Sequence, residues 1–229
     1  MSLPPFVARL IGIGKYDEYS HLQPEGDTNV KSLEKFLKDD PTLNRGIDVE
    51  TIIENVTRDN IIKIFDELGN SIDRNKAILI FFSGYGGRTV AGRRLSIICP
   101  ADIGASDKSK GITDQELVHY FDSISRFRGN NIVSDSSSTH ENEAETYITL
   151  QTFLLDCPSS EFKWGNPSSF VVIAPRTVPP ENRGAFTKSI IRVLRSEKDS
   201  LAFLTVHSFA AKIHAAMCVS YELCPVING

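Results

Sequence analysis

Apolar residues in this chain form two alternating patterns. Short continuous runs, without the alternation of a half-exposed strand, are typical of strands buried on both faces of a parallel sheet. Between these runs, apolar residues recur at spacings of three and four, which is the pattern of a helix with one buried face. The continuous runs predict strands at 6–13, 49–53, 77–83, 147–155 and 169–174. The helical stripes predict helices at 27–38, 57–72, 113–124, 185–194 and 205–217.

Capping residues support several of these helices. Asp27, Thr57 and Thr205 can each act as an N-cap, and Thr113 with Glu116 forms a capping box. A hairpin is expected over residues 88–99, and the tail at 219–227 is a candidate edge strand.

Strands that alternate with helices predict an α/β fold of three layers, with a central, mostly parallel sheet of about six strands flanked by helices. One domain is expected over residues 1–229, with the polar stretch 129–145 as a loop insertion.

Composition excludes several classes of function. A net charge of −4 offers no basic face for nucleic acid and no polybasic membrane signal. No apolar run approaches the roughly 20 residues of a membrane span. The four cysteines lack metal-ligand spacing and are too few for a disulfide framework. We therefore expect a cytoplasmic protein without a signal peptide, metal or cofactor.

Two predicted strands end in unusual residues. The run 77–83 leads into Gly84-Tyr85-Gly86-Gly87, and the strand 147–155 leads into Asp156-Cys157-Pro158. Because ligands of open α/β sheets bind at the carboxyl ends of strands, we expect the two tips to meet in one crevice. With a histidine at the first tip and a cysteine at the second, this crevice would be a cysteine peptidase site.

Four stretches resemble caspase-fold domains of the metacaspase and fungal caspase-like type. The similarity extends from about residue 8 to the C-terminus, on Leu10-Ile11-Gly12-Ile13-Gly14-Lys15-Tyr16, Gly84-Tyr85-Gly86, Asp156-Cys157-Pro158-Ser159-Ser160 and Arg183-Gly184-Ala185-Phe186-Thr187.

The resemblance assigns expected roles to individual residues. It implies that Tyr85 stands at the position of the catalytic histidine and Pro158 at that of the nucleophilic cysteine, while Gly86 keeps an oxyanion-donor position. Asp156 matches one member of an acidic pocket for a basic substrate residue. The other member maps to Thr28 or Asn29, with Asp27 adjacent.

The two replaced positions predict loss of the peptidase mechanism. A phenol with a pKa of about 10 cannot shuttle protons at neutral pH as imidazole does. Proline lacks both the thiol and the backbone N–H that would serve as an oxyanion donor. We therefore expect a pseudopeptidase, with no intact catalytic residues, that binds a peptide or protein partner such as an active relative.

Two alternatives remain open at this stage. Cys157 would be the nucleophile of an active cysteine endopeptidase with a rearranged site, although it lies one residue from the family position and so on the opposite face of an extended strand. In the other alternative, an α/β domain reuses the crevice for a small molecule or nucleotide.

Overall fold

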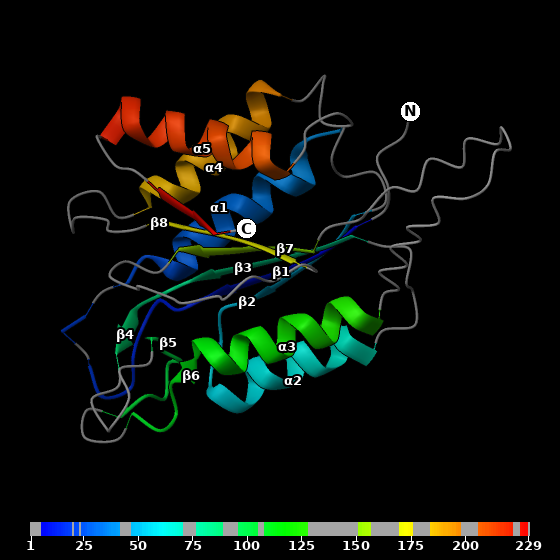
Figure 1. The fold of residues 1–229 in the computed structure, drawn as a ribbon. Coiled ribbons are helices and arrows are strands. Elements are labelled where there is room, and N and C mark those ends of the chain that lie inside the picture. Colours follow the sequence, from blue (N-terminus) through cyan, green and yellow to red (C-terminus); the bar gives the residue numbers. More distant parts are fainter. Residues whose placement is uncertain are drawn as a thin grey trace, which may run out of the picture.

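The computed structural model describes residues 6–19, 21–22, 24–41, 47–70, 77–88, 96–104, 108–127, 151–156, 170–175, 184–197, 206–221 and 225–228. The central feature is a six-stranded sheet in the order β2-β1-β3-β7-β8-β9 (Figure 1). The first five strands in that order pair in parallel, and β9 is antiparallel to β8 at the edge. The strands are β1 (Phe6–Gly12), β2 (Ile47–Ile52), β3 (Ala77–Ser83), β7 (Gln151–Asp156), β8 (Phe170–Pro175) and β9 (Pro225–Asn228). The predicted mostly parallel sheet of about six strands is confirmed.

Helices cover both faces of this sheet (Figure 1). On one face lie α1 (Gly26–Asp39), α4 (Ala185–Ser196) and α5 (Val206–Tyr221). On the other face lie α2 (Arg58–Asn70) and α3 (Asp114–Phe127). This arrangement is the three-layer α/β architecture that the sequence predicts.

The continuous apolar runs are explained by this double cover. Successive side chains of a strand point to opposite faces, so a central strand needs apolar residues at every position. Phe81 packs in the hydrophobic core formed with α1, α4 and α5, whereas Phe82 packs in the core formed with α2 and α3. Both phenylalanines are buried, and the neighbouring β1 residues Leu10 and Ile11 divide between the two cores in the same way.

A small antiparallel sheet follows β3. It consists of β4 (Gly86–Arg88), β5 (Ser96–Ile98) and β6 (Ile112–Thr113). The β4–β5 pairing confirms the predicted hairpin, whose turn lies outside the described residues.

The predicted helix caps have mixed outcomes. The Thr57 hydroxyl accepts a hydrogen bond from the Asn60 N–H at 3.4 Å, and the Thr113–Glu116 capping box is formed in both directions. The N-cap prediction for Asp27 is wrong, because α1 begins at Gly26 with Glu25 as the N-cap residue. Asp27 lies instead in the first helical turn, where a carboxylate is stabilised by the positive end of the helix dipole.

The predicted tail strand starts too early. Helix α5 continues to Tyr221 and the edge strand begins only at Pro225. The cap Thr205, the polar stretch 129–145 and residues 147–150 of the fourth predicted strand lie outside the described residues. No helix in the described part of the chain has the length and apolar character of a membrane span.

Candidate active site

The carboxyl ends of β1, β3 and β7 lie side by side. Ser83 is the register partner of Gly12 in β1 and of Asp156 in β7. The pairing continues beyond the strands, because the Ile13 N–H donates to the Ser83 carbonyl at 3.0 Å and the Gly84 N–H donates to the Asp156 carbonyl at 3.2 Å. The prediction that these two strand tips meet is therefore confirmed.

Two helices begin directly at these strand ends. A β-carbon on Gly26, the first residue of α1, would lie 2.3 Å from the Ser83 carbonyl oxygen, so only glycine allows this approach. Gly184, the N-cap residue of α4, has a φ of 73°, a conformation that side-chain-bearing residues disfavour. A β-carbon there would lie 2.8 Å from Asn29 Oδ1. The N-termini of α1 and α4 therefore meet beside Asn29.

Asp156 and three other buried polar side chains form a cluster. The Asp156 Oδ2 atom accepts hydrogen bonds from Thr187 Oγ1 at 3.0 Å, Asn29 Nδ2 at 3.1 Å and Ser83 Oγ at 3.3 Å. Asn29 Nδ2 also donates to Ser83 Oγ at 3.0 Å. Since the four residues belong to α1, β3, β7 and α4, this polar cluster joins four elements at one point.

The environment of Asp156 shifts its protonation. The residue is 4% exposed, and burial raises the pKa of its carboxyl group to about 6. The hydrogen bonds from Thr187 and Ser83 oppose this rise, because they stabilise the carboxylate, whereas the charge of Glu25 adds to it. Desolvation is the largest effect, so the buried carboxyl group holds a proton more tightly than an exposed one.

Tyr85 is packed into the protein at the end of β3. Its ring lies 5.6 Å from the ring of the buried Tyr16, centroid to centroid, and contacts the core formed with α2 and α3. Its hydroxyl oxygen is buried. The Tyr85 N–H donates to the Tyr16 hydroxyl at 2.7 Å, and that hydroxyl donates onward to the Cys99 carbonyl at 3.2 Å. Tyr85 thus contributes to packing around Tyr16.

Gly86 lies at the start of β4 opposite Ile98. The adjacent bond, from the Cys99 N–H to the Tyr85 carbonyl at 2.9 Å, makes Gly86 and Ile98 a non-hydrogen-bonded pair of the antiparallel ladder. The Gly86 N–H therefore points away from β5, the orientation that a donor to a bound group would need.

The other predicted site residues are distributed unevenly. Cys157 and Pro158 lie outside the described residues. Of the two candidates for the second pocket position, Asn29 is buried in the polar cluster and Thr28 is exposed. Asp27 lines a separate pocket of ≈ 420 Å³ with Gly14 and others, and its Oδ2 lies 4.0 Å from Lys31 Nζ.

Sequence reasoning missed three residues of this region. Ser83 and Thr187 complete the polar cluster, and Tyr16 holds the backbone of Tyr85. A signal was present for Ser83, which is the polar end of an apolar run. Thr187 and Tyr16 end two of the stretches that resemble the family, but the sequence assigned a role to neither, because their contacts depend on how distant elements are placed. Among the described residues, no group of three or more potential metal-ligating side chains lies together.

The strand order, the helices on both faces and the polar residues at the ends of β3 and β7 define a three-layer α/β protein with a candidate site at the carboxyl edge of its sheet. The family model of the caspase domain, peptidase family C14, matches residues 6–222. The chain therefore belongs to the caspase-domain family.

Solved structures share this fold at low sequence identity. The crystal structure of the Drosophila initiator caspase Dronc is similar with a TM-score of 0.60 and 11% identity, over 97% of this chain and 78% of that one. The structure of pro-sf-caspase-1 is similar with a TM-score of 0.64 and 12% identity, over 100% of this chain and 92% of that one. No curated protein matches the sequence.

Proposed function

We propose that this chain is a caspase domain without a working cysteine–histidine dyad, of the metacaspase and fungal caspase-like type, that acts by binding a peptide or protein. The packing of Tyr85 carries this proposal. The ring at the histidine position contacts Tyr16 and a hydrophobic core, and its hydroxyl oxygen is buried. A general base must reach the proton that it abstracts, and a phenol packed against a hydrophobic core does not meet this geometric need.

The nucleophile position supports the same conclusion. Pro158 offers neither a thiol nor a backbone N–H donor. Loss of one oxyanion donor alone costs about 10²–10³ in rate. Loss of the nucleophile, the base and one donor together removes the chemistry, while the Gly86 N–H remains for binding.

The polar cluster supports the inference that the acidic pocket implied by the resemblance no longer binds a basic substrate residue. Asp156 is buried and accepts three hydrogen bonds from the protein itself. A carboxylate that is already satisfied by internal donors has little to offer a basic side chain of a substrate. Asn29, which is neutral, occupies the neighbouring position.

Peptide cleavage by the purified chain tests this proposal. We expect no turnover of Arg-, Lys- or Asp-directed fluorogenic peptides above the rate of a Cys157→Ala variant. Cys99→Ala is the matched control, since it removes a different cysteine. Turnover that is retained in Cys99→Ala and lost in Cys157→Ala would overturn the proposal and assign Cys157 as the nucleophile of an active endopeptidase.

A further inference from the structure

The pocket of ≈ 420 Å³ that Asp27 lines opens at the carboxyl ends of β1 and β2. Its walls are the segment after β1, the segment after β2, the first turn of α1 and Ala101, and we call it the β1–β2 pocket. Ligands of open α/β sheets bind at this end of the strands, and cavities of this size hold small organic molecules. Its position and volume are therefore those of a small-molecule site.

Backbone hydrogen bonds join the walls of the β1–β2 pocket. The Asp17 N–H donates to the Ala101 carbonyl at 3.0 Å, and the Ala101 N–H donates to the Val56 carbonyl at 2.8 Å. Ala101 thus connects the segment after β1 with the segment after β2. Because main-chain contacts between separate segments define the cavity, a ligand would find it already formed, and binding would cost little conformational entropy.

The Asp27 carboxylate is fixed within this pocket. Its Oδ1 accepts the Thr28 N–H at 2.8 Å, and a β-carbon on Gly14 would lie only 2.7 Å from Asp27 Cγ. Gly14 therefore allows the carboxylate to lie against the main chain of the segment after β1. Lys31 Nζ lies 4.0 Å from Asp27 Oδ2, and a pair of exposed side chains at this distance is weak. The carboxylate thus keeps its capacity to bind a cationic group.

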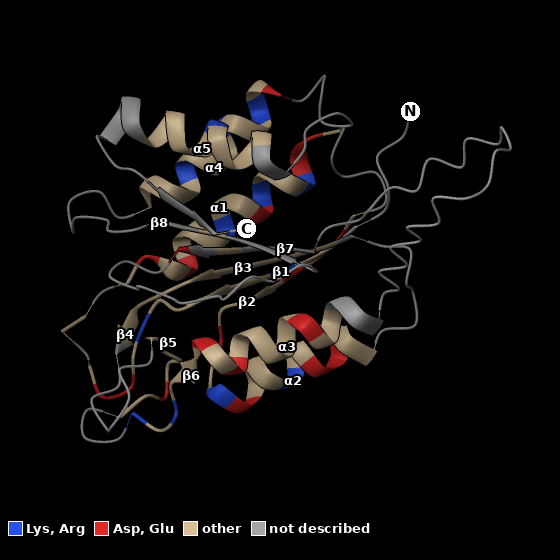
Figure 2. Cartoon of the chain, in the orientation of Figure 1, with Lys and Arg blue, Asp and Glu red and all other residues tan. Residues whose placement is uncertain are grey.

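The segment that joins β1 to α1 carries both signs of charge (Figure 2). Its residues Lys15 and Asp17 line the pocket and are exposed. Neither forms an ion pair with another residue in the described part of the chain. Ile53 and Ala101 add apolar surface to the same cavity. One ammonium group, two carboxylates and an apolar wall therefore border a single space.

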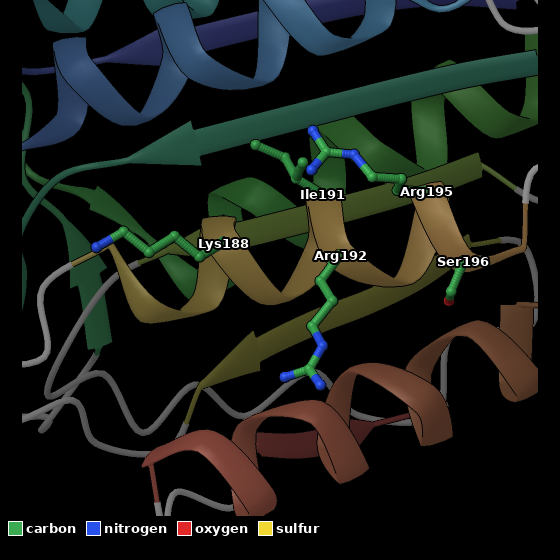
Figure 3. Close-up of a pocket in the computed structure, with 5 residues that line it drawn as sticks. All are labelled: Lys188, Ile191, Arg192, Arg195 and Ser196. Carbon is green, nitrogen blue, oxygen red and sulfur yellow. The ribbon is translucent and has the colours of Figure 1, made fainter.

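The hollow beside α4 has no such combination of groups. It measures ≈ 520 Å³ and is lined by Lys188, Ile191, Arg192, Arg195 and Ser196, none of which is acidic. Figure 3 shows that Arg192 points toward α5, whereas Arg195 points to the opposite side of α4. These two guanidinium groups therefore do not bind one small ligand together.

We propose that the β1–β2 pocket binds a small zwitterion with an apolar side chain, which is either an α-amino acid or a dipeptide. Asp27 and Asp17 bind the ammonium group of the ligand, and Lys15 binds its carboxylate. The apolar side chain of the ligand contacts Ile53 and Ala101. A ligand with a single charge would satisfy one of these partners and be repelled by the other. This site is separate from the residues that carry the proposed function, so either proposal can fail alone.

A titration with L-leucine, followed by two-dimensional NMR of the protein, tests this proposal. Two matched compounds each lack one charge: isopentylamine has no carboxylate, and 4-methylpentanoate has no ammonium group. For a ligand of about nine non-hydrogen atoms we expect a Kd on the order of 1 mM, and binding of each matched compound that is at least about tenfold weaker. The dipeptide L-alanyl-L-leucine distinguishes the two sources of ligand, because it binds more tightly than leucine only if the pocket accepts two residues.

Two substitutions locate the charged ends of the ligand. Lys15→Gln should weaken leucine binding about tenfold and should not weaken isopentylamine binding, because it removes only the partner of the carboxylate. Asp27→Asn should weaken the binding of both compounds, while its amide oxygen can still accept the Thr28 N–H at the start of α1. Lys63→Gln on α2 makes the same change in net charge as Lys15→Gln on the other face of the sheet, and should leave both affinities unchanged. Thermal unfolding verifies that each variant is folded.

Three results would overturn the proposal. Unchanged resonances of the pocket residues at about 10 mM leucine or dipeptide would show that the pocket binds no zwitterion. Binding of isopentylamine or 4-methylpentanoate as tight as that of leucine would assign the pocket to a simple cation or a simple anion. Equal weakening by Lys15→Gln and Lys63→Gln would show only a long-range effect of net charge.

Discussion

The buried carboxyl group of Asp156 makes a sharp prediction about stability and pH. Its pKa of about 6 lies above the ordinary value of 3.8, because burial disfavours the charged form. The difference corresponds to about 3 kcal/mol. A group whose pKa is raised in the folded state adds stability at low pH, and that contribution is lost as the pH rises through the folded-state value. The contribution of Asp156 is thus complete below about pH 4 and falls away as the pH passes about 6.

The variant Asp156→Asn isolates this effect. An amide oxygen can accept hydrogen bonds at the place of Oδ2, but the side chain stays neutral at every pH. Other carboxyl groups titrate alike in both proteins, so their contributions cancel in the difference. We expect the free energy of unfolding of the variant, minus that of the wild type, to rise by about 3 kcal/mol between about pH 4 and pH 7.5.

Urea unfolding followed by circular dichroism measures this difference at each pH. The competing effect is the pair of hydrogen bonds from Thr187 and Ser83, which lowers the pKa of Asp156. If those bonds outweigh burial, the wild type will gain stability relative to Asp156→Asn as the pH rises. A difference of that sign, or one that is flat across the range, refutes the reasoning that desolvation dominates.

Three further predictions follow from the same region. Thr187→Val removes a hydrogen-bond donor that lies 3.0 Å from the Asp156 carboxylate, and in urea titrations it should lower the free energy of unfolding by about 1–3 kcal/mol at pH 7.5. The effect should be smaller at pH 4.5, because the hydrogen bond to the charged carboxylate is stronger than the bond to the neutral acid. Gly26→Ala should lower the melting temperature strongly, since its β-carbon would lie 2.3 Å from the Ser83 carbonyl oxygen. Gly69→Ala in α2, whose β-carbon would lie 3.9 Å from its nearest neighbours in α3, should be neutral or stabilising by up to about 1 kcal/mol, and equal effects of the two changes would contradict this account of close approach. The double variant Tyr85→His with Pro158→Cys should cleave Arg- or Lys-directed peptides more slowly than an active family member, because the packing around Tyr16 and the neutral Asn29 stay in place. Full activity of this variant would contradict the prediction and show that the chain lacks only these two catalytic side chains.

Elements with strong periodicity were predicted well. Central strands such as β3 are apolar at every position because both faces are covered, and this requirement is visible in the sequence. Local hydrogen bonds were predicted equally well, as the Thr113–Glu116 capping box illustrates. Element ends were less accurate where a tertiary contact decides them. Helix α1 starts at Gly26 because Gly26 lies close to the Ser83 carbonyl oxygen. The tendency of aspartate to cap helices, on which the prediction for Asp27 was based, gives no information about this contact.

By itself, the sequence determined the layered α/β architecture and the meeting of two strand tips. That Tyr85 and Pro158 stand where the family has its catalytic pair stays a prediction from the resemblance. These features depend on local patterning and on motifs of a few residues. The tertiary structure alone decided that Asn29 and Thr187 reach Asp156 and that Tyr16 holds Tyr85. The physical reason is that burial and hydrogen bonding between distant segments depend on how helices sit on the sheet, and neither charge nor spacing along the chain specifies that placement.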